Sequence, residues 1–278
     1  MIIDWHANLW LPEHYADGGN QMVTRVGQSV DGGPQSFDEH IAGVCEKFVI
    51  VTMNFEPLGV AVPNEFVADY AKKYPGRAKA LANVNPLDEK APRQFEYAIK
   101  ELGMHGLKMS PVYGAYDPWC EGARKLYKLC EQLNVPILWH QSAGYAAGCA
   151  LEYGSPILLD RICREFPKLR MIIAHLGQPW MEECVVLLRK NPHIYSDLSA
   201  RFHRKWQLYH GLMTALEYKV HKQLLFGSDF PLRTPKEAME EFRAINDWGP
   251  GASMPKFPDE AIEDIINNRP IELLWPEG

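Results

Sequence analysis

Four side chains that can bind metal each lie at the end of a short apolar run that is typical of a β-strand. They are His6 after Met1-Ile-Ile-Asp-Trp, His140 after Pro136-Ile-Leu-Trp, His175 after Met171-Ile-Ile-Ala, and Asp229 after Leu224-Leu-Phe-Gly-Ser. Imidazole nitrogens and a carboxylate suit zinc and similar divalent ions. A lone histidine after a strand is usually a hydrogen-bonded core residue, but three histidines with an aspartate favour a metal site.

Strand-like runs of this kind recur along the chain and alternate with amphipathic helical stretches. The expected strands are Ile2–His6, Lys47–Thr52, Ala78–Val84, Gly106–Met109, Val135–His140, Arg170–His175, Ile194–Asp197 and Gln223–Phe226. Eight such units predict the α/β class and a (β/α)8 TIM barrel, which brings the carboxyl ends of its strands to one mouth. The alternative is an open doubly wound sheet, which is disfavoured because no Gly-x-Gly-x-x-Gly or Walker loop follows a strand.

Composition excludes several other classes of protein. The chain has 278 residues, of which 46% are hydrophobic and 23% charged, with a formal net charge of -6. We expect one domain over residues 1–278, no nucleic-acid partner because no basic run occurs, and no membrane span because no apolar stretch approaches about 18 residues. Six cysteines without paired spacing and the lack of a signal-peptide pattern favour a cytoplasmic protein.

A long glycine-rich segment follows the first expected strand, at about residues 11–36. Connections of this length are uncommon in compact domains. The segment could be a lid over the barrel mouth, with Arg25 available to a carboxylate. A subunit contact or a plain excursion of the chain is equally compatible with the sequence.

The chain resembles the amidohydrolase superfamily over nearly its whole length. The resemblance is carried by Ile3-Asp-Trp-His6, Gly106-Leu-Lys-Met-Ser-Pro111, His140 after its strand, Ile173-Ala-His-Leu-Gly177 and Phe226-Gly-Ser-Asp-Phe-Pro231. The similar branch is the amidohydrolase-related one. It includes aminocarboxymuconate semialdehyde decarboxylase, aromatic acid decarboxylases and the hydrolase of pyrone dicarboxylate.

This resemblance implies a barrel of the metal-dependent hydrolase type and a role for each strand-end residue. His6, His140 and Asp229 would hold one divalent metal ion, and His175 would act beside it as an acid or base or would polarise the substrate. Asp229 would also take a proton from metal-bound water. Zinc is the expected ion and manganese the alternative.

Asn8 departs from the family pattern, which usually opens with His-x-His. His6 and Asn8 lie on the same face of a regular strand, because side chains alternate every two residues. An amide oxygen is a poor ligand for zinc and suits a harder ion such as manganese better. Asn8 could therefore ligate weakly or hydrogen-bond water or substrate, or the protein could work with little tightly held metal.

Three further residues are candidates for binding substrate: Lys108, Trp10 and Arg201. In several two-metal amidohydrolases a carboxylated lysine on the fourth strand bridges both ions, but Asn8 breaks the first-strand pair that such a site needs. We therefore favour Lys108 as a cation for a substrate carboxylate, with a salt bridge inside the mouth as its alternative. Arg201 could bind a carboxylate bidentately and Trp10 could line the pocket; packing within a loop is the alternative for both.

The favoured function is a metal-dependent hydrolase acting through metal-activated water on a small carboxylated ester, lactone or amide. The preserved Asp4-x-His6 opening resembles the hydrolase-type members of the branch. The alternative is a lyase, a non-oxidative decarboxylase or hydratase of an unsaturated or aromatic acid at the same site. A third hypothesis is a barrel that only binds a ligand, motivated by Asn8. The expected partner is a small-molecule carboxylate, and a homo-oligomer is left open.

Overall fold

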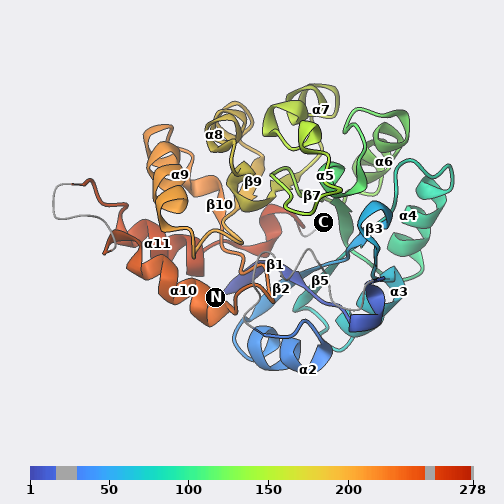
Figure 1. Cartoon of the computed structure of the whole chain (residues 1–278), viewed down its shortest axis with the longest axis horizontal. Helices are drawn as coiled ribbons and strands as arrows, with labels where there is room; N and C mark the ends of the chain where they lie inside the picture. The colour runs from blue at the N-terminus through green and yellow to red at the C-terminus, as the bar shows by residue number, and fades with distance from the viewer. Residues whose placement is uncertain (17–29, 248–253, 277–278) are drawn as a thin grey trace.

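The computed structural model describes residues 1–16, 30–247 and 254–276 and contains a nearly closed barrel of eight parallel strands (Figure 1). In their order around the barrel the strands are β1 (Ile3–Asn8), β2 (Lys47–Val51), β5 (Ala78–Asn83), β6 (Gly106–Met109), β7 (Ile137–Trp139), β8 (Met171–Ile173), β9 (Ile194–Asp197) and β10 (Leu224–Leu225). All eight predicted strands are present, so the (β/α)8 prediction is confirmed. A small antiparallel pair, β3 (Asn54–Phe55) and β4 (Val60–Ala61), was not predicted.

Helices surround the strands in a ring, as Figure 1 shows. They are α2 (Pro34–Phe37), α3 (Asn64–Ala71), α4 (Ala91–Lys100), α5 (Pro111–Gly114), α6 (Glu121–Gln132), α7 (Asp160–Glu165), α8 (Met181–Lys190), α9 (Lys205–Glu217), α10 (Pro235–Arg243) and α11 (Asp259–Asn267). Local sequence explains where they begin: α10 starts with Pro235 after Thr234, whose side chain forms a capping box with Glu237. Among the described helices, none is long and apolar enough to cross a membrane.

Short helical turns make up much of the remaining connections. They are η1 (Pro12–His14), the π-turn η2 (Asp38–Ala42), η3 (Glu56–Leu58), η4 (Leu151–Tyr153), η5 (Pro156–Leu159), η6 (Ala174–Gly177), η7 (His221–Gln223), η8 (Ala244–Asn246) and η9 (Ile271–Leu273). Within the predicted loop at 11–36, the described residues contain η1 near its start and the beginning of α2 at Pro34. Arg25 and the proposed lid lie outside the described residues.

A β-bulge in β1 aims its last residues at the barrel mouth. Between Asp4 and Ala7 the strand advances three residues while its partner β2 advances two, from Phe48 to Ile50. An extra residue reverses the inside-outside alternation. Trp5 therefore packs in the barrel interior, whereas His6 and Asn8, one and three residues later, both reach the pocket at the mouth.

The barrel closes between β1 and the segment after β10. Backbone hydrogen bonds of 3.0, 2.9 and 2.9 Å join Trp5 N to Phe226 O, Asp229 N to His6 O and Asn8 N to Phe230 O. Asp4, buried beside them, accepts hydrogen bonds from Ser228 N at 3.0 Å and Ser228 Oγ at 2.5 Å. Burial raises the pKa of Asp4 to about 6, against the lowering effect of the Ser228 bonds. These contacts hold His6 and Asp229 next to each other.

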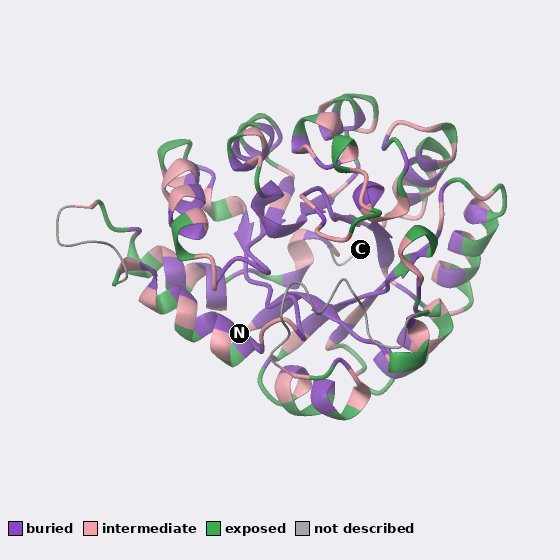
Figure 2. Cartoon of the chain, in the orientation of Figure 1, coloured by how far each residue is buried: buried purple, intermediate pink, exposed green. Residues whose placement is uncertain are grey.

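Two apolar cores hold the barrel together. The larger lies between strands and helices, and the smaller fills the barrel interior with residues such as Trp5, Val51 and Leu138. The strands at the centre of the molecule are coloured mainly as buried in Figure 2. The interior core continues into Ile271 and Leu274, and the Trp5 and Trp275 rings stack with centroids 6.3 Å apart. The C-terminal segment thus seals the barrel.

Candidate active site

One pocket at the barrel mouth is lined by eight of the residues that the sequence suggested for chemistry or binding. These are His6, Asn8, Trp10, Lys108, His140, His175, Arg201 and Asp229. The pocket has a volume of about 70 Å³, which is room for several waters or one small organic acid. All eight side chains belong to buried residues, so their polar atoms depend on each other and on a ligand for partners.

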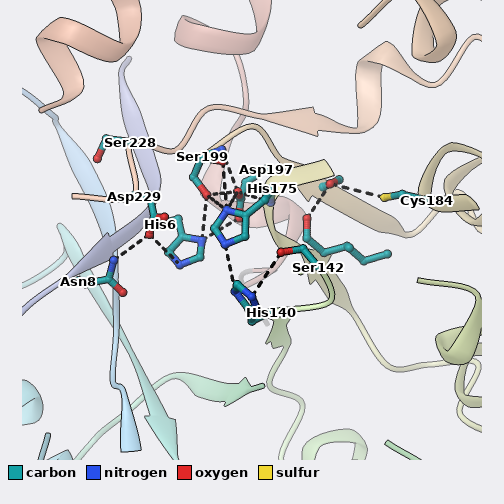
Figure 3. Close-up of polar contacts among 12 residues, drawn as sticks. His6, Asn8, His140, Ser142, His175, Cys184, Asp197, Ser199, Ser228 and Asp229 are labelled. Atoms are coloured by element: carbon teal, nitrogen blue, oxygen red, sulfur yellow. Dashed lines mark hydrogen bonds and ion pairs between the residues drawn. The ribbon is translucent and has the colours of Figure 1, made fainter. Parts of the chain in front are cut away.

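His6 is oriented by a residue that the sequence analysis missed. Its Nδ1 lies 3.0 Å from Asp197 Oδ2 and 3.2 Å from Ser199 Oγ (Figure 3). A carboxylate only accepts hydrogen bonds, so this network assigns the ring hydrogen to Nδ1 and leaves the lone pair of neutral His6 on Nε2. Nε2 faces Asp229 Oδ1 at 3.6 Å and Lys108 Nζ at 3.4 Å.

Asp197, at the end of β9, hydrogen-bonds to His6, His175 and Ser199. Although burial alone would raise its pKa, the neighbouring His6, His175 and Ser199 hold the pKa of the carboxyl below its usual range. Its Oδ1 accepts from the backbone N–H groups of His175 at 3.1 Å and Ser199 at 3.0 Å, and from the Ser199 hydroxyl. We call His6, His140, His175, Asp197 and Ser199 the histidine cluster.

His175 and His140 form the rest of the histidine cluster. His175 Nδ1 lies 3.1 Å from Ser199 O and 2.8 Å from Ser199 Oγ, and its Nε2 lies 3.1 Å from His140 Nδ1. Burial lowers the pKa of both histidines well below the usual value, and Lys108 lowers that of His140 further. Both rings are therefore neutral near pH 7, which is the form that binds metal or accepts a proton.

Two candidate catalytic residues have a strained backbone conformation. His175 has φ 61° and Asp229 has φ 58°, in the left-handed region that residues other than glycine rarely adopt. Such conformations cost free energy and cluster at functional sites. The strain turns each side chain from the end of its strand into the pocket.

Asn8 acts as a hydrogen-bond donor in this structure. Its Nδ2 donates to Asp229 Oδ1 and to Phe230 O, each at 2.8 Å. Both partners are acceptors, so the orientation of the amide is assigned by the network. Of the three roles left open by the sequence, the geometry matches hydrogen bonding, with Asp229 in place of water or substrate.

The residues that approach most closely as a ligand set are His6, His175 and Asp197. In the described part of the chain, these three each offer a donor atom within 4.8 Å of the others and could hold a metal ion. The predicted set of His6, His140 and Asp229 shares only His6 with this group. Ser199 Oγ occupies the space beside the two Nδ1 atoms, so an ion would fit on the pocket side, where Nε2 of His6 approaches Asp229.

Lys108 and Arg201 bring two buried positive charges to the same pocket. Burial lowers the pKa of Lys108 to about 8, against Asp197 and Asp229, which raise it. Arg201 is 3% exposed and hydrogen-bonds Tyr145, but its Nε and Nη1 have no partner among the described residues. Burial also lowers the pKa of Arg201. Unpaired buried guanidinium nitrogens are costly unless a ligand completes them.

Aromatic side chains form the remaining walls. Trp10 packs edge-on against Tyr15, with centroids 5.6 Å apart, and the Tyr113 ring lies 4.1 Å from that of His140. A Cβ atom at Gly32 would come within 2.5 Å of the Trp10 ring, so glycine at this position lets the chain cover Trp10. The predicted pocket role of Trp10 is compatible with this geometry.

Comparison with known proteins identifies the family of this chain. A model described as amidohydrolase matches residues 3–274. The chain belongs to the amidohydrolase family. This amidohydrolase is accordingly an enzyme, and the superfamily predicted from the strand-end motifs is confirmed. No curated protein matched it.

Solved structures similar to the amidohydrolase share its fold at low sequence identity. An uncharacterised TIM-barrel protein from Bordetella bronchiseptica is 22% identical, with TM-score 0.71 and 96% and 95% of the two chains covered. A probable 2-pyrone-4,6-dicarboxylic acid hydrolase from Acinetobacter baumannii, with citric acid bound, is 19% identical, with TM-score 0.70 and 99% of each chain covered. A mutant 5-carboxyvanillate decarboxylase from Novosphingobium aromaticivorans, with bound manganese and a nitrobenzoic acid, is 14% identical, with TM-score 0.64 and 96% and 94% covered.

Proposed function

We propose that this amidohydrolase is a metal-dependent hydrolase that cleaves a small carboxylated ester, lactone or amide. The observation that carries the proposal is that one pocket holds both a carboxylate–imidazole pair and a buried cation. Asp229 Oδ1 lies 3.6 Å from His6 Nε2, and the buried guanidinium of Arg201 lines the same pocket. The pair of Asp229 and His6 supports chemistry on a carbonyl group, and Arg201 supports binding of a carboxylate.

Substrate binding rests on the two buried cations. The Nε and Nη1 atoms of Arg201 would donate to a substrate carboxylate, and Lys108 would add a second positive charge. Burial strengthens these interactions because the local dielectric constant is low. The volume of the pocket and the walls formed by Trp10 and Tyr113 suit a small ring or short chain.

The donor atoms on the pocket side fit one divalent ion. Bonds of about 2.0–2.2 Å to an imidazole nitrogen and a carboxylate oxygen together exceed the 3.6 Å that separates His6 Nε2 from Asp229 Oδ1, so one ion can contact both. His140 would supply a further imidazole, which favours zinc, whereas the carboxylate also suits manganese. When bound, the ion would supply a more acidic water and would polarise the substrate carbonyl.

The protein's own proton acceptors are Asp229 and His175. Asp229 Oδ1 already accepts from Asn8, and no described residue bonds to Oδ2, which would take the proton of the attacking water. His175 Nδ1 faces Ser199 O, and with the ring hydrogen on Nδ1 its Nε2 would carry the lone pair, so His175 would relay the proton taken by Asp229 to the leaving group. Asp197 would stabilise the imidazolium formed in this step.

Replacing Asp229 by asparagine tests the hydrolytic proposal. Asp229→Asn keeps the size of the side chain but removes the proton acceptor, so we expect turnover to fall at least about 100-fold. The assay is hydrolysis of a panel of carboxylated lactones, esters and amides, with the folded state followed by circular dichroism. Asp69→Asn, on the exposed face of α3, is the matched control. Near-normal turnover of Asp229→Asn would overturn the proposal.

A lyase at the same site is the second candidate. The ring of Tyr113, tilted by 30° against that of His140 at 4.1 Å, forms a wall that suits a planar unsaturated acid. In that case a protonated histidine would deliver its proton to carbon as carbon dioxide leaves. Release of carbon dioxide from a candidate acid, without a hydrolysed product, would favour the lyase over the hydrolase.

A further inference from the structure

His6 Nε2 offers one lone pair to the pocket, and Lys108 already faces it. The Nδ1 hydrogen of His6 is committed to Asp197 at 3.0 Å, so Nε2 is the acceptor. Lys108 Nζ lies 3.4 Å from this atom. Within the described chain, Lys108 forms no ion pair with a carboxylate, and its recorded hydrogen-bond partner is His6. The side chain is buried, with 3% exposed, and extends from the end of β6.

A metal ion would need the same lone pair. An ion held by Nε2 and Asp229 would use the lone pair that Lys108 Nζ faces at 3.4 Å, so the ion and the amine would compete for it. The ion and the ammonium also carry charges of the same sign, and they repel strongly where little water screens them. Lys108 must therefore turn away before an ion binds, and its flexible four-carbon stem allows that movement.

We propose that Lys108 competes with the divalent ion for Nε2 of His6, so that the protein holds its ion weakly and exchangeably. This inference rests on the metal site of the proposed function. It assigns to Lys108 a positioning role in metal loading in addition to binding of a carboxylate. Asp229 and Asp197 favour both competitors alike, because each carboxylate attracts the ammonium as well as the ion.

Manganese titration by calorimetry of chelator-treated protein tests the competition. Manganese is the better probe because the chain has free cysteines, Cys120 and Cys149 among them partly exposed, whose thiols bind zinc preferentially. Lys108→Met removes the charge and keeps the length of the side chain, so we expect it to bind manganese at least about tenfold more tightly than the wild type. Lys79→Met, a half-buried lysine over Trp275, should leave the affinity unchanged.

Two further variants separate this inference from the metal site itself. Lys108→Arg keeps the positive charge and should bind manganese no more tightly than the wild type. Asp229→Asn in the Lys108→Met background should weaken binding, which identifies the titrated site. Equal affinity of Lys108→Met and wild type, with Asp229→Asn still weakening both, would overturn the competition and leave the metal site standing. Absence of binding in both would overturn the metal site and the competition together.

Should Lys108→Met fail to fold in circular dichroism, Lys108→Gln serves in its place. Glutamine removes the charge and retains a hydrogen-bond donor, so it isolates charge from packing. Its affinity for manganese should also exceed that of the wild type, and an affinity equal to or below wild type would count against the competition.

Discussion

The histidine cluster and the two buried cations, Lys108 and Arg201, share one pocket but differ in how far their polar atoms are satisfied. In the histidine cluster, Asp197 and Ser199 bond to His6 and His175, which in turn contacts His140. Arg201, by contrast, leaves Nε and Nη1 without partners among the described residues. A completed network holds its geometry before a ligand arrives. An incomplete one shows where the negative charge of a ligand is still needed.

The largest expected effect is the loss of stability on replacing Asp197, the carboxylate to which the completed network bonds. Asp197→Ala removes the carboxylate that accepts from the Nδ1–H of His6 and from the backbone N–H groups of His175 and Ser199. A buried donor that loses its acceptor costs about 1–3 kcal/mol, and Asp197 accepts from several, so the free energy of unfolding should fall by about 3 kcal/mol or more. Urea denaturation followed by tryptophan fluorescence measures the change.

Asp197→Asn is the matched variant, since it keeps the shape and one acceptor oxygen. It should lose less stability than Asp197→Ala, while metal affinity falls roughly 10- to 100-fold in both because His6 is no longer oriented. A loss of less than about 1 kcal/mol in Asp197→Ala would mean that the histidine cluster is not the preorganised part of the pocket.

Removing an unsatisfied cation should have a different outcome. Arg201→Met replaces a buried charge by an apolar side chain of similar length, so the free protein should be as stable as the wild type or more stable. Its affinity for benzoate, a simple carboxylate probe, should fall about 10- to 100-fold, since hydrogen bonds to charged groups are worth about 1.5–3 kcal/mol. Calorimetry measures the affinity and urea denaturation the stability.

Arg161→Met, which removes an arginine from α7 outside the pocket, controls for general loss of charge. It should leave benzoate binding unchanged. If Arg201→Met destabilised the protein as much as Asp197→Ala, Arg201 would be a structural residue, and the distinction between the two parts of the pocket would fail.

The fold and the pocket residues could be predicted from sequence because each depends on local pattern. Apolar runs ending in His140, His175 and Asp229 carry both the strand and the position of the side chain at its end. The barrel then requires that these ends converge. Closure of β1 against the segment after β10 follows from the same topology.

The roles of Asp197 and Ser199 could not be predicted from local sequence pattern. The strand Ile194–Asp197 was expected, and its terminal aspartate was the available signal, but no surrounding motif distinguished it. Whether a strand-end carboxylate faces an imidazole depends on the register of strands that are far apart in sequence. The bulge in β1, which turns His6 towards Asp197, is likewise a property of strand pairing.

The smallest expected effect concerns Asn8, which lies at the boundary between the two parts of the pocket. Asn8→Ala removes the bonds to Asp229 Oδ1 and Phe230 O, but Phe230 O still accepts from the backbone N of residue 8 at 2.9 Å. Asp229 Oδ1 faces the pocket and can exchange its lost partner for water. We therefore expect a loss of only about 1 kcal/mol in the free energy of unfolding, measured by urea denaturation.

Asn8→Asp is the informative counterpart, because it is similar in size but places a second carboxylate beside Asp229. Repulsion between the two should make this variant less stable than Asn8→Ala in the absence of metal, and added manganese should recover the difference by neutralising the pair. If Asn8→Ala instead cost as much as Asp197→Ala, Asn8 would belong to the completed network. Asp229 would then be held as rigidly as His6 and would belong to the same preorganised part of the pocket.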